Sequence, residues 1–172
     1  MAEKALYVLA GYDDRTEEIL SGIQKSLYEQ GFSGVQTKDI PMHFTLGSWP
    51  VDREKELKER LRQAAASHPA FGVAFSHVGL FRLPQNDVLF IAPETGREML
   101  DLKDEFMDSM DPFSWSPHTT MLIDRPEVVR EALASVLDTF PAVSGKVEKL
   151  YLYEFWPARH ILSVQLRPDA RG

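Results

Sequence analysis

The feature that most constrains this chain is a short motif that occurs twice, once in each half. The first copy is His43-Phe44-Thr45-Leu46 and the second is His118-Thr119-Thr120-Met121, so each reads His-x-Thr followed by an apolar residue. The copies lie about 75 residues apart, and two Pro-containing turns, at residues 84–86 and 157–159, have nearly the same offset. This weak internal repeat predicts a pseudo-twofold protein with two similar lobes.

Apolar periodicity divides the sequence into alternating strands and helices with few long loops. Strands are predicted at residues 5–10, 40–46, 71–83, 87–92, 117–123, 147–156 and 160–167. Helices are predicted at 14–30, 52–67, 95–110 and 126–139, the second of them capped by Asp52. We therefore expect an α+β fold, a single domain over residues 1–172, in which each lobe has an antiparallel sheet with two helices on its outer side.

Composition and charge exclude several classes of function. The chain has 172 residues, of which 44% are hydrophobic and none is cysteine, so it offers no disulfide framework, thiolate metal site or cysteine nucleophile and suits a reducing cytoplasm. The first apolar run, residues 5–10, is too short for a signal peptide or a membrane span. The net charge is −7 with scattered Lys and Arg, which argues against binding to an extended duplex nucleic acid. A small nucleotide or one RNA end, held in a local pocket, remains a possible ligand.

Each motif has a polar and an apolar side if it is part of a strand. Side chains alternate between the two faces of a strand, so His43 and Thr45 share one face while Phe44 and Leu46 share the other. The second motif divides in the same way. If a twofold relates the halves, the two polar faces meet in one groove, with two imidazoles and two hydroxyls converging.

Two imidazoles and two hydroxyls are suited to phosphodiester cleavage. A neutral imidazole can take a proton from the attacking water or hydroxyl, while a protonated one gives a proton to the leaving oxygen. The threonine hydroxyls can donate to the non-bridging oxygens of the phosphate. We predict His43 as the base and His118 as the acid in one direction, with the roles exchanged in reverse, and Thr45 and Thr120 as the phosphate-binding pair.

Other assignments of these residues are weaker. The histidines could be purely structural, or they could bind zinc, but zinc needs three or four ligands and neither motif supplies a second one. A serine triad lacks the Gly-x-Ser-x-Gly elbow. His68, His77 and His160 are expected to be structural. We therefore predict no metal and no cofactor.

Aromatic residues near the motifs are candidates for stacking on a nucleobase. Trp49 and Trp115 lie closest to the motifs in sequence and are the preferred substrate-binding pair, ahead of Phe81 and Tyr153. A tryptophan beside Pro and Ser in a turn more often covers the hydrophobic core, and that alternative stays open for both.

The paired motifs resemble the signature of the 2H phosphoesterase superfamily, which includes the 2′-5′ RNA ligase-like proteins and cyclic nucleotide phosphodiesterases. The resemblance covers nearly the whole chain through its length, element order and motif spacing. It implies a bilobal α+β fold in which two antiparallel sheets line a central cleft, with the helices outside. It also implies His43 and His118 as the catalytic pair, Thr45 and Thr120 as the phosphate-binding pair, and no metal. Many members carry an Arg shortly after the second motif, and Arg125, one or two positions late, is the candidate here.

The expected function is thus a metal-independent phosphoesterase, hydrolase or ligase, acting on 2′,3′-cyclic phosphate or 2′-5′ phosphodiester bonds of a small nucleotide or RNA end. The alternative is a protein that keeps the cleft and binds a phosphate ligand or an RNA end without turning it over. The sequence leaves the substrate, the direction of reaction and the oligomeric state open.

Overall fold

The computed structural model describes residues 3–34, 37–110 and 114–169. Its strands are β1 (Ala5–Tyr12), β2 (His43–Pro50), β3 (Phe71–Arg82), β4 (Asp87–Pro93), β5 (Thr119–Asp124), β6 (Val143–Phe155) and β7 (Arg159–Gln165). Its helices are α1 (Asp14–Glu29), α2 (Glu54–Ser67), α3 (Arg97–Asp104) and α4 (Pro126–Thr139), with a 3₁₀ turn, η1 (Val51–Arg53), before α2. The predicted order of strands and helices is the observed one.

The sheet is antiparallel throughout and has the order β2-β1-β6-β3-β4-β5, with β7 also paired to β6. Strand β6 joins the two lobes because its first residues, 143–147, pair with β3, while residues 149–154 pair with β7 on the same edge. Its other edge pairs with β1. The first lobe therefore contains β2, β1, β7 and the end of β6, and the second contains β5, β4, β3 and the start of β6. The two predicted sheets are present, and β6 makes them continuous.

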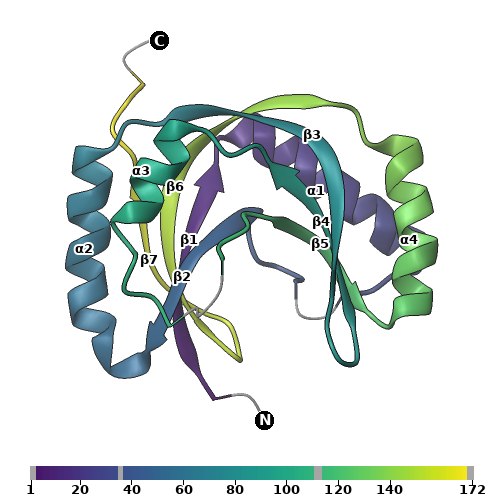
Figure 1. The fold of residues 1–172 in the computed structure, drawn as a ribbon, viewed down its shortest axis with the longest axis horizontal. Coiled ribbons are helices and arrows are strands. Elements are labelled where there is room, and N and C mark those ends of the chain that lie inside the picture. Colours follow the sequence, from purple (N-terminus) through teal and green to yellow (C-terminus); the bar gives the residue numbers. More distant parts are fainter. Residues whose placement is uncertain (1–2, 35–36, 111–113, 170–172) are drawn as a thin grey trace.

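The helices cover the outer side of the bent sheet in two pairs (Figure 1). Helices α2 and α3 lie over the first lobe, and α1 and α4 lie over the second. Each lobe is consequently built from both halves of the sequence, since α1 and the β3–β4 hairpin belong to the second lobe, whereas α3 and the β6–β7 hairpin belong to the first. The fold is α+β and bilobal, as predicted.

The predicted start of helix α2 and the predicted end of helix α3 are wrong. Helix α2 begins at Glu54 after η1, so its N-cap is Arg53, without a side-chain hydrogen bond, and Asp52 is not the cap. Helix α3 ends at Asp104, not at residue 110. The following segment instead joins the end of β2, where the Met110 amide donates to the Ser48 carbonyl at 2.9 Å. That tertiary hydrogen bond replaces the helical one that the periodicity predicts.

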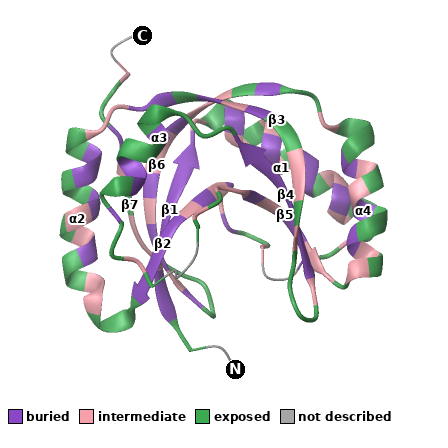
Figure 2. Cartoon of the chain, viewed as in Figure 1, coloured by how far each residue is buried: buried purple, intermediate pink, exposed green. Residues whose placement is uncertain are grey.

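One large cluster of buried apolar side chains lies between the sheet and the helices and includes residues from both lobes. Figure 2 shows this as buried colour on the strands and on the inward sides of the helices. Leu20 and Leu27 of α1, Leu57 of α2 and Val129 of α4 are all at most 1% exposed, which is the outcome expected of amphipathic helices. Among the described residues, no helix has both the length and the apolar character needed to cross a membrane.

Candidate active site

Strand β2 presents the first motif as the alternation predicts. Phe44 and Leu46 are fully buried in the main core, whereas His43 and Thr45 are only half-buried on the opposite, concave face. Just before the motif, the Met42 amide donates to both carboxylate oxygens of Glu17 at 3.0 and 3.1 Å. This contact from α1 fixes the start of the strand and therefore the position of His43.

The second motif is arranged in the same way at the start of β5. Thr119 and Met121 are buried, and His118 and Thr120 are half-buried. The Thr119 hydroxyl forms a buried 2.6 Å hydrogen bond with the phenol oxygen of Tyr12, which links β5 of the second lobe to β1 of the first. Strand β5, which begins directly after His118, is thus tied to β1 on the core side of the sheet.

Both motif histidines are oriented by the same local hydrogen bond. The His43 Nδ1 lies 2.7 Å from the carbonyl oxygen of Pro41, and the His118 Nδ1 lies 2.9 Å from that of Ser116. A carbonyl only accepts, so each Nδ1 carries the proton in the neutral ring. Each Nε2 is then the nitrogen left to accept or donate a proton toward a ligand.

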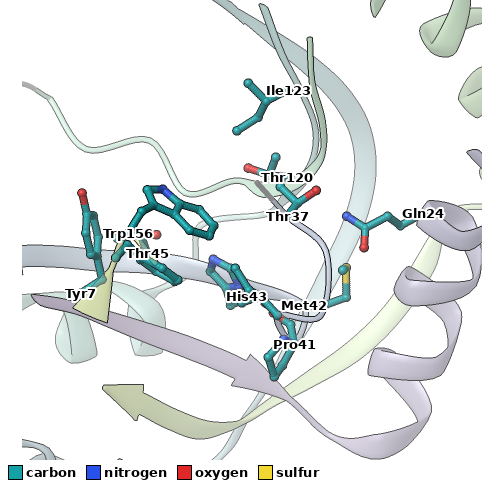
Figure 3. Close-up of a pocket in the computed structure, with 12 residues that line it drawn as sticks. Tyr7, Gln24, Thr37, Pro41, Met42, His43, Thr45, Thr120, Ile123 and Trp156 are labelled. Carbon is teal, nitrogen blue, oxygen red and sulfur yellow. Dashed lines mark hydrogen bonds between the residues drawn. The ribbon is translucent and has the colours of Figure 1, made fainter. Parts of the chain in front are cut away.

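Two adjoining cavities contain the motif residues. The His43 cavity, of about 210 Å³, contains His43, Thr45 and Thr120, whose side chains meet from β2 and β5 (Figure 3). Its other described lining residues are Tyr7, Gln24, Thr37, Ile40, Pro41, Met42, Ile123, Phe155 and Trp156. The His118 cavity, of about 560 Å³, is lined by Thr45, Leu80, Phe81, Arg82, Leu83, Ser114, Trp115, Ser116 and His118. Thr45 lines both cavities, so the two cavities, each with one motif histidine, adjoin at this residue.

Burial keeps both imidazoles neutral at neutral pH. It lowers the pKa of His43 to about 4, and the hydrogen bond to the Pro41 carbonyl only partly opposes this, while nearby His118 lowers the pKa further. Burial also lowers the pKa of His118, against the opposing effect of the Ser116 carbonyl. Because two positively charged imidazoles repel each other, protonation of one ring disfavours protonation of the other unless an anion lies between them.

Aromatic side chains pack around the His118 ring. Its centroid lies 4.8 Å from that of Phe81 in an edge-to-face arrangement and 5.4 Å from that of Phe90. Trp115 supports the other motif, because its indole N–H donates to the Thr45 carbonyl at 2.9 Å. These contacts hold the rings and strands that line the His118 cavity.

The structure corrects two of the predicted ligand contacts. Trp49 is fully buried against Phe106, with its indole N–H 3.3 Å from Asp108, so it belongs to the core and cannot stack on a ligand. Arg125 lies at the N-cap of α4, pairs with Glu127 at 3.2 Å and lines neither cavity. Proximity in sequence misled both assignments. Alternation alone would place Trp49 on the face of His43 and Thr45, but the register of β2 against β1 shifts by one residue between Thr45 and Gly47, which turns Trp49 into the core. At Arg125 the chain leaves the strand and enters helix α4.

Of the three other predicted aromatic residues, two line a cavity and one does not, and other lining residues were missed. Trp115 and Phe81 line the His118 cavity, and Tyr153 lies in the small apolar cluster behind the His43 cavity. Sequence reasoning missed Trp156 and Arg82, the one Lys or Arg among the described lining residues. Both are in or beside hairpin turns that are remote from the motifs in sequence. The sequence feature that could have indicated them is the correspondence of these two turns in the internal repeat. Within the described ranges, no group of three or more His, Asp or Glu side chains is placed to hold a metal ion.

The fold and the site together define a bilobal α+β protein in which each lobe carries one His-x-Thr motif, and the two motifs line two cavities that share Thr45. Residues 13–155 match the family model of the 2′-5′ RNA ligase superfamily, and the chain belongs to that superfamily. Membership supports phosphoesterase-type activity. No curated protein matches the chain by sequence.

Several solved structures share the fold. TT0787 of Thermus thermophilus is 16% identical, with a TM-score of 0.63 over 96% of this chain and 99% of that one. E. coli LigT in complex with 3′-AMP is 17% identical, with a TM-score of 0.59 over 95% and 97% of the two chains. Usb1 of Kluyveromyces marxianus with uridine monophosphate is 13% identical, with a TM-score of 0.54 over 95% and 98%. The latter two structures each contain a small nucleotide.

Proposed function

We propose that this protein is a metal-independent phosphoesterase of the 2H type, acting on a 2′,3′-cyclic phosphate or a 2′-5′ phosphodiester bond of a small nucleotide or RNA end. The observation that carries the proposal is the matched orientation of the two motif histidines. Each donates a hydrogen bond from Nδ1–H to the carbonyl two residues earlier, which leaves its Nε2 to exchange a proton with a ligand, and the two rings line cavities that share Thr45. We place the protein in the cytoplasm, as the sequence predicts.

In the hydrolytic direction, the Nε2 of neutral His43 takes a proton from water as the water oxygen attacks phosphorus. The bond between phosphorus and one ribose oxygen breaks, and the Nε2 of protonated His118 gives its proton to that oxygen. The products are a phosphate monoester and a free hydroxyl, with one water consumed. Thr45 and Thr120 donate hydroxyl hydrogens to the non-bridging oxygens, whose negative charge grows in the transition state.

The lowered pKa of His43 suits the role of base. His43 is neutral above about pH 4 and is therefore ready to act as the base. His118 needs a proton, and a phosphate anion in the cleft would raise its pKa because opposite charge stabilises imidazolium. Binding of the substrate would thus supply the charge that protonates the acid.

Histidine variants test the proposal. We expect His43→Ala and His118→Ala each to lower the turnover of adenosine 2′,3′-cyclic phosphate or a 2′-5′-linked dinucleotide by about 10²- to 10⁴-fold. His77→Ala is the matched control, since His77 is an exposed residue of β3 that lines neither cavity. Activity should survive a chelator. Chelator-sensitive turnover would contradict the metal-free mechanism, and intact ligand recovered with measurable affinity would favour the non-catalytic binding protein.

A further inference from the structure

Trp156 is an unusually exposed aromatic residue for its position. It lies in the turn after β6, is 43% exposed, and is the one aromatic side chain among the large exposed hydrophobic residues of the described ranges. It also lines the His43 cavity, and Figure 3 shows its indole extending into that cavity from the β6 hairpin. An indole left in water at the edge of the cavity that contains His43 is placed to contact a ligand.

A row of rings holds the indole from behind. Its centroid lies 4.8 Å from that of Phe155, which stacks on Tyr153 at 5.5 Å with an angle of 13° between the planes. Phe155 also contacts Tyr7, at 5.2 Å. These side chains belong to a separate apolar cluster on the cleft side of β1 and β6. The wall therefore exists before any ligand arrives, which reduces the entropy lost on binding.

The chemistry of the His43 cavity favours an uncharged, planar group next to Trp156. Its described lining residues include no Lys, Arg, Asp or Glu, so it offers no partner for a second phosphate. Apolar side chains such as Ile40 and Ile123 complete the lining. Its volume of about 210 Å³ is below the roughly 300–1,000 Å³ of pockets that enclose a whole drug-sized ligand, so it suits part of a nucleotide.

Two polar side chains of the cavity already have partners. The Gln24 amide nitrogen donates to the Met121 carbonyl at 3.2 Å, and the Thr37 hydroxyl donates to the Gly34 carbonyl at 3.0 Å. These bonds hold the two side chains in place, and contact with the face of a base uses neither of them. Stacking accepts any base because every base has an aromatic face.

We infer that Trp156 forms a base-stacking subsite, in which the nucleobase lies against the indole while the attached phosphate lies at His43, Thr45 and Thr120. The inference rests on the proposed function and deepens it: the ligand is a nucleotide recognised by its phosphate and the face of its base, with little discrimination among bases. Trp115 is less suited to this role, because its N–H is bonded to Thr45 and the Lys103 ammonium lies 5.5 Å from the ring centroid.

The test compares ligands with and without a base. The probes are adenosine 3′-monophosphate for binding, and adenosine 2′,3′-cyclic phosphate and 1-O-methylribose 2,3-cyclic phosphate, which has no base, for turnover. We expect Trp156→Ala to raise the Kd and KM of the adenosine ligands about 5- to 100-fold and to leave kcat and the KM of the base-free ligand within about twofold. Trp156→Phe should recover most of the loss, and uridine ligands should show a smaller loss than adenosine ligands.

Controls separate this inference from the proposed function. Leu137→Ala, at an exposed position of α4 that lines neither cavity, is the matched surface variant and should bind as the wild type does. Equal weakening of base-bearing and base-free ligands in Trp156→Ala, or no weakening, would overturn the subsite while turnover by the wild type upheld the function. Trp156-dependent binding without turnover of any phosphoester would refute the function and support the subsite. If the wild type bound no nucleotide, both would be refuted.

Discussion

At the scale of single residues, the carbonyls of Pro41 and Ser116 determine which ring nitrogen of each motif histidine is available for proton transfer. By accepting hydrogen bonds from the Nδ1–H groups, they fix the tautomer and the ring orientation of His43 and His118. Burial then lowers both pKa values, more strongly than these hydrogen bonds raise them. The protonation of His43 and His118 should therefore determine how the rate of phosphoester hydrolysis depends on pH.

The pH dependence of kcat/KM follows from these pKa values. The productive free enzyme has neutral His43 and protonated His118, so its population is greatest above the His43 pKa of about 4 and below the lowered pKa of His118. We expect a bell-shaped profile with its maximum on the acidic side of neutrality, measured with a cyclic nucleotide. In His118→Ala, the residual activity should lose the alkaline limb. A maximum above neutrality would contradict this assignment.

Thr45 is the residue that lines both cavities, so its hydroxyl should matter more than its bulk. Thr45→Val keeps the β-branched shape and removes the donor. A hydrogen bond to a charged group is worth about 1.5–3 kcal/mol, so kcat/KM should fall about 10- to 100-fold, while Thr45→Ser keeps most of the activity. Full activity in Thr45→Val, with an unchanged melting temperature, would rule out the phosphate contact.

At the scale of elements, the β3–β4 hairpin shapes the surroundings of His118. Gly79 of β3 lies opposite Phe90 of β4, whose ring covers the glycine and also contacts the His118 ring. A Cβ at position 79 would lie 2.3 Å from the Phe90 Cζ, so no side chain fits without moving Phe90. The packing of two strands is thus linked to the position of one imidazole.

Gly79→Ala should therefore damage both stability and activity. Overpacking of this kind typically costs about 1–3 kcal/mol, so we expect a lower free energy of unfolding together with a reduced kcat. Gly72→Ala, in the same strand, is the control, because its Cβ would meet only the Gly145 carbonyl oxygen at 3.9 Å. Urea unfolding and steady-state kinetics measure the two effects. Wild-type values of both in Gly79→Ala would show that Phe90 moves without consequence.

At the scale of the whole molecule, the two lobes are interlocked. Strand β6 belongs to both sheets, the main core includes residues from both lobes, and each lobe takes helices from both halves of the chain. The buried Tyr12–Thr119 hydrogen bond adds a link between β1 and β5. The two lobes therefore share one main core.

We accordingly expect a single cooperative unfolding transition, which also tests the predicted single domain. Far-ultraviolet circular dichroism and tryptophan fluorescence should give coincident urea curves. Tyr12→Phe leaves the Thr119 hydroxyl buried without its partner, so it should lower the free energy of unfolding by about 1–3 kcal/mol and keep one transition. Two separated transitions would show that the lobes unfold independently.

The sequence by itself determined the order of the elements, the α+β class and the faces of both motifs. These follow from local periodicity, because period 2 decides which side chains share a face of a strand and period 3.6 decides which share a face of a helix. The alternation from His43 to Leu46 and from His118 to Met121 appears in the burial of those residues for that reason.

Only the tertiary structure decided which distant segments meet. That β6 joins both sheets, that Trp49 packs on Phe106 inside the core, and that Trp156 reaches the His43 cavity all depend on contacts between residues far apart in the chain. The same holds for the segment after α3, which leaves its predicted helix to bond with β2. Periodicity carries no information about such partners, because the burial of a side chain depends on what the rest of the fold places over it.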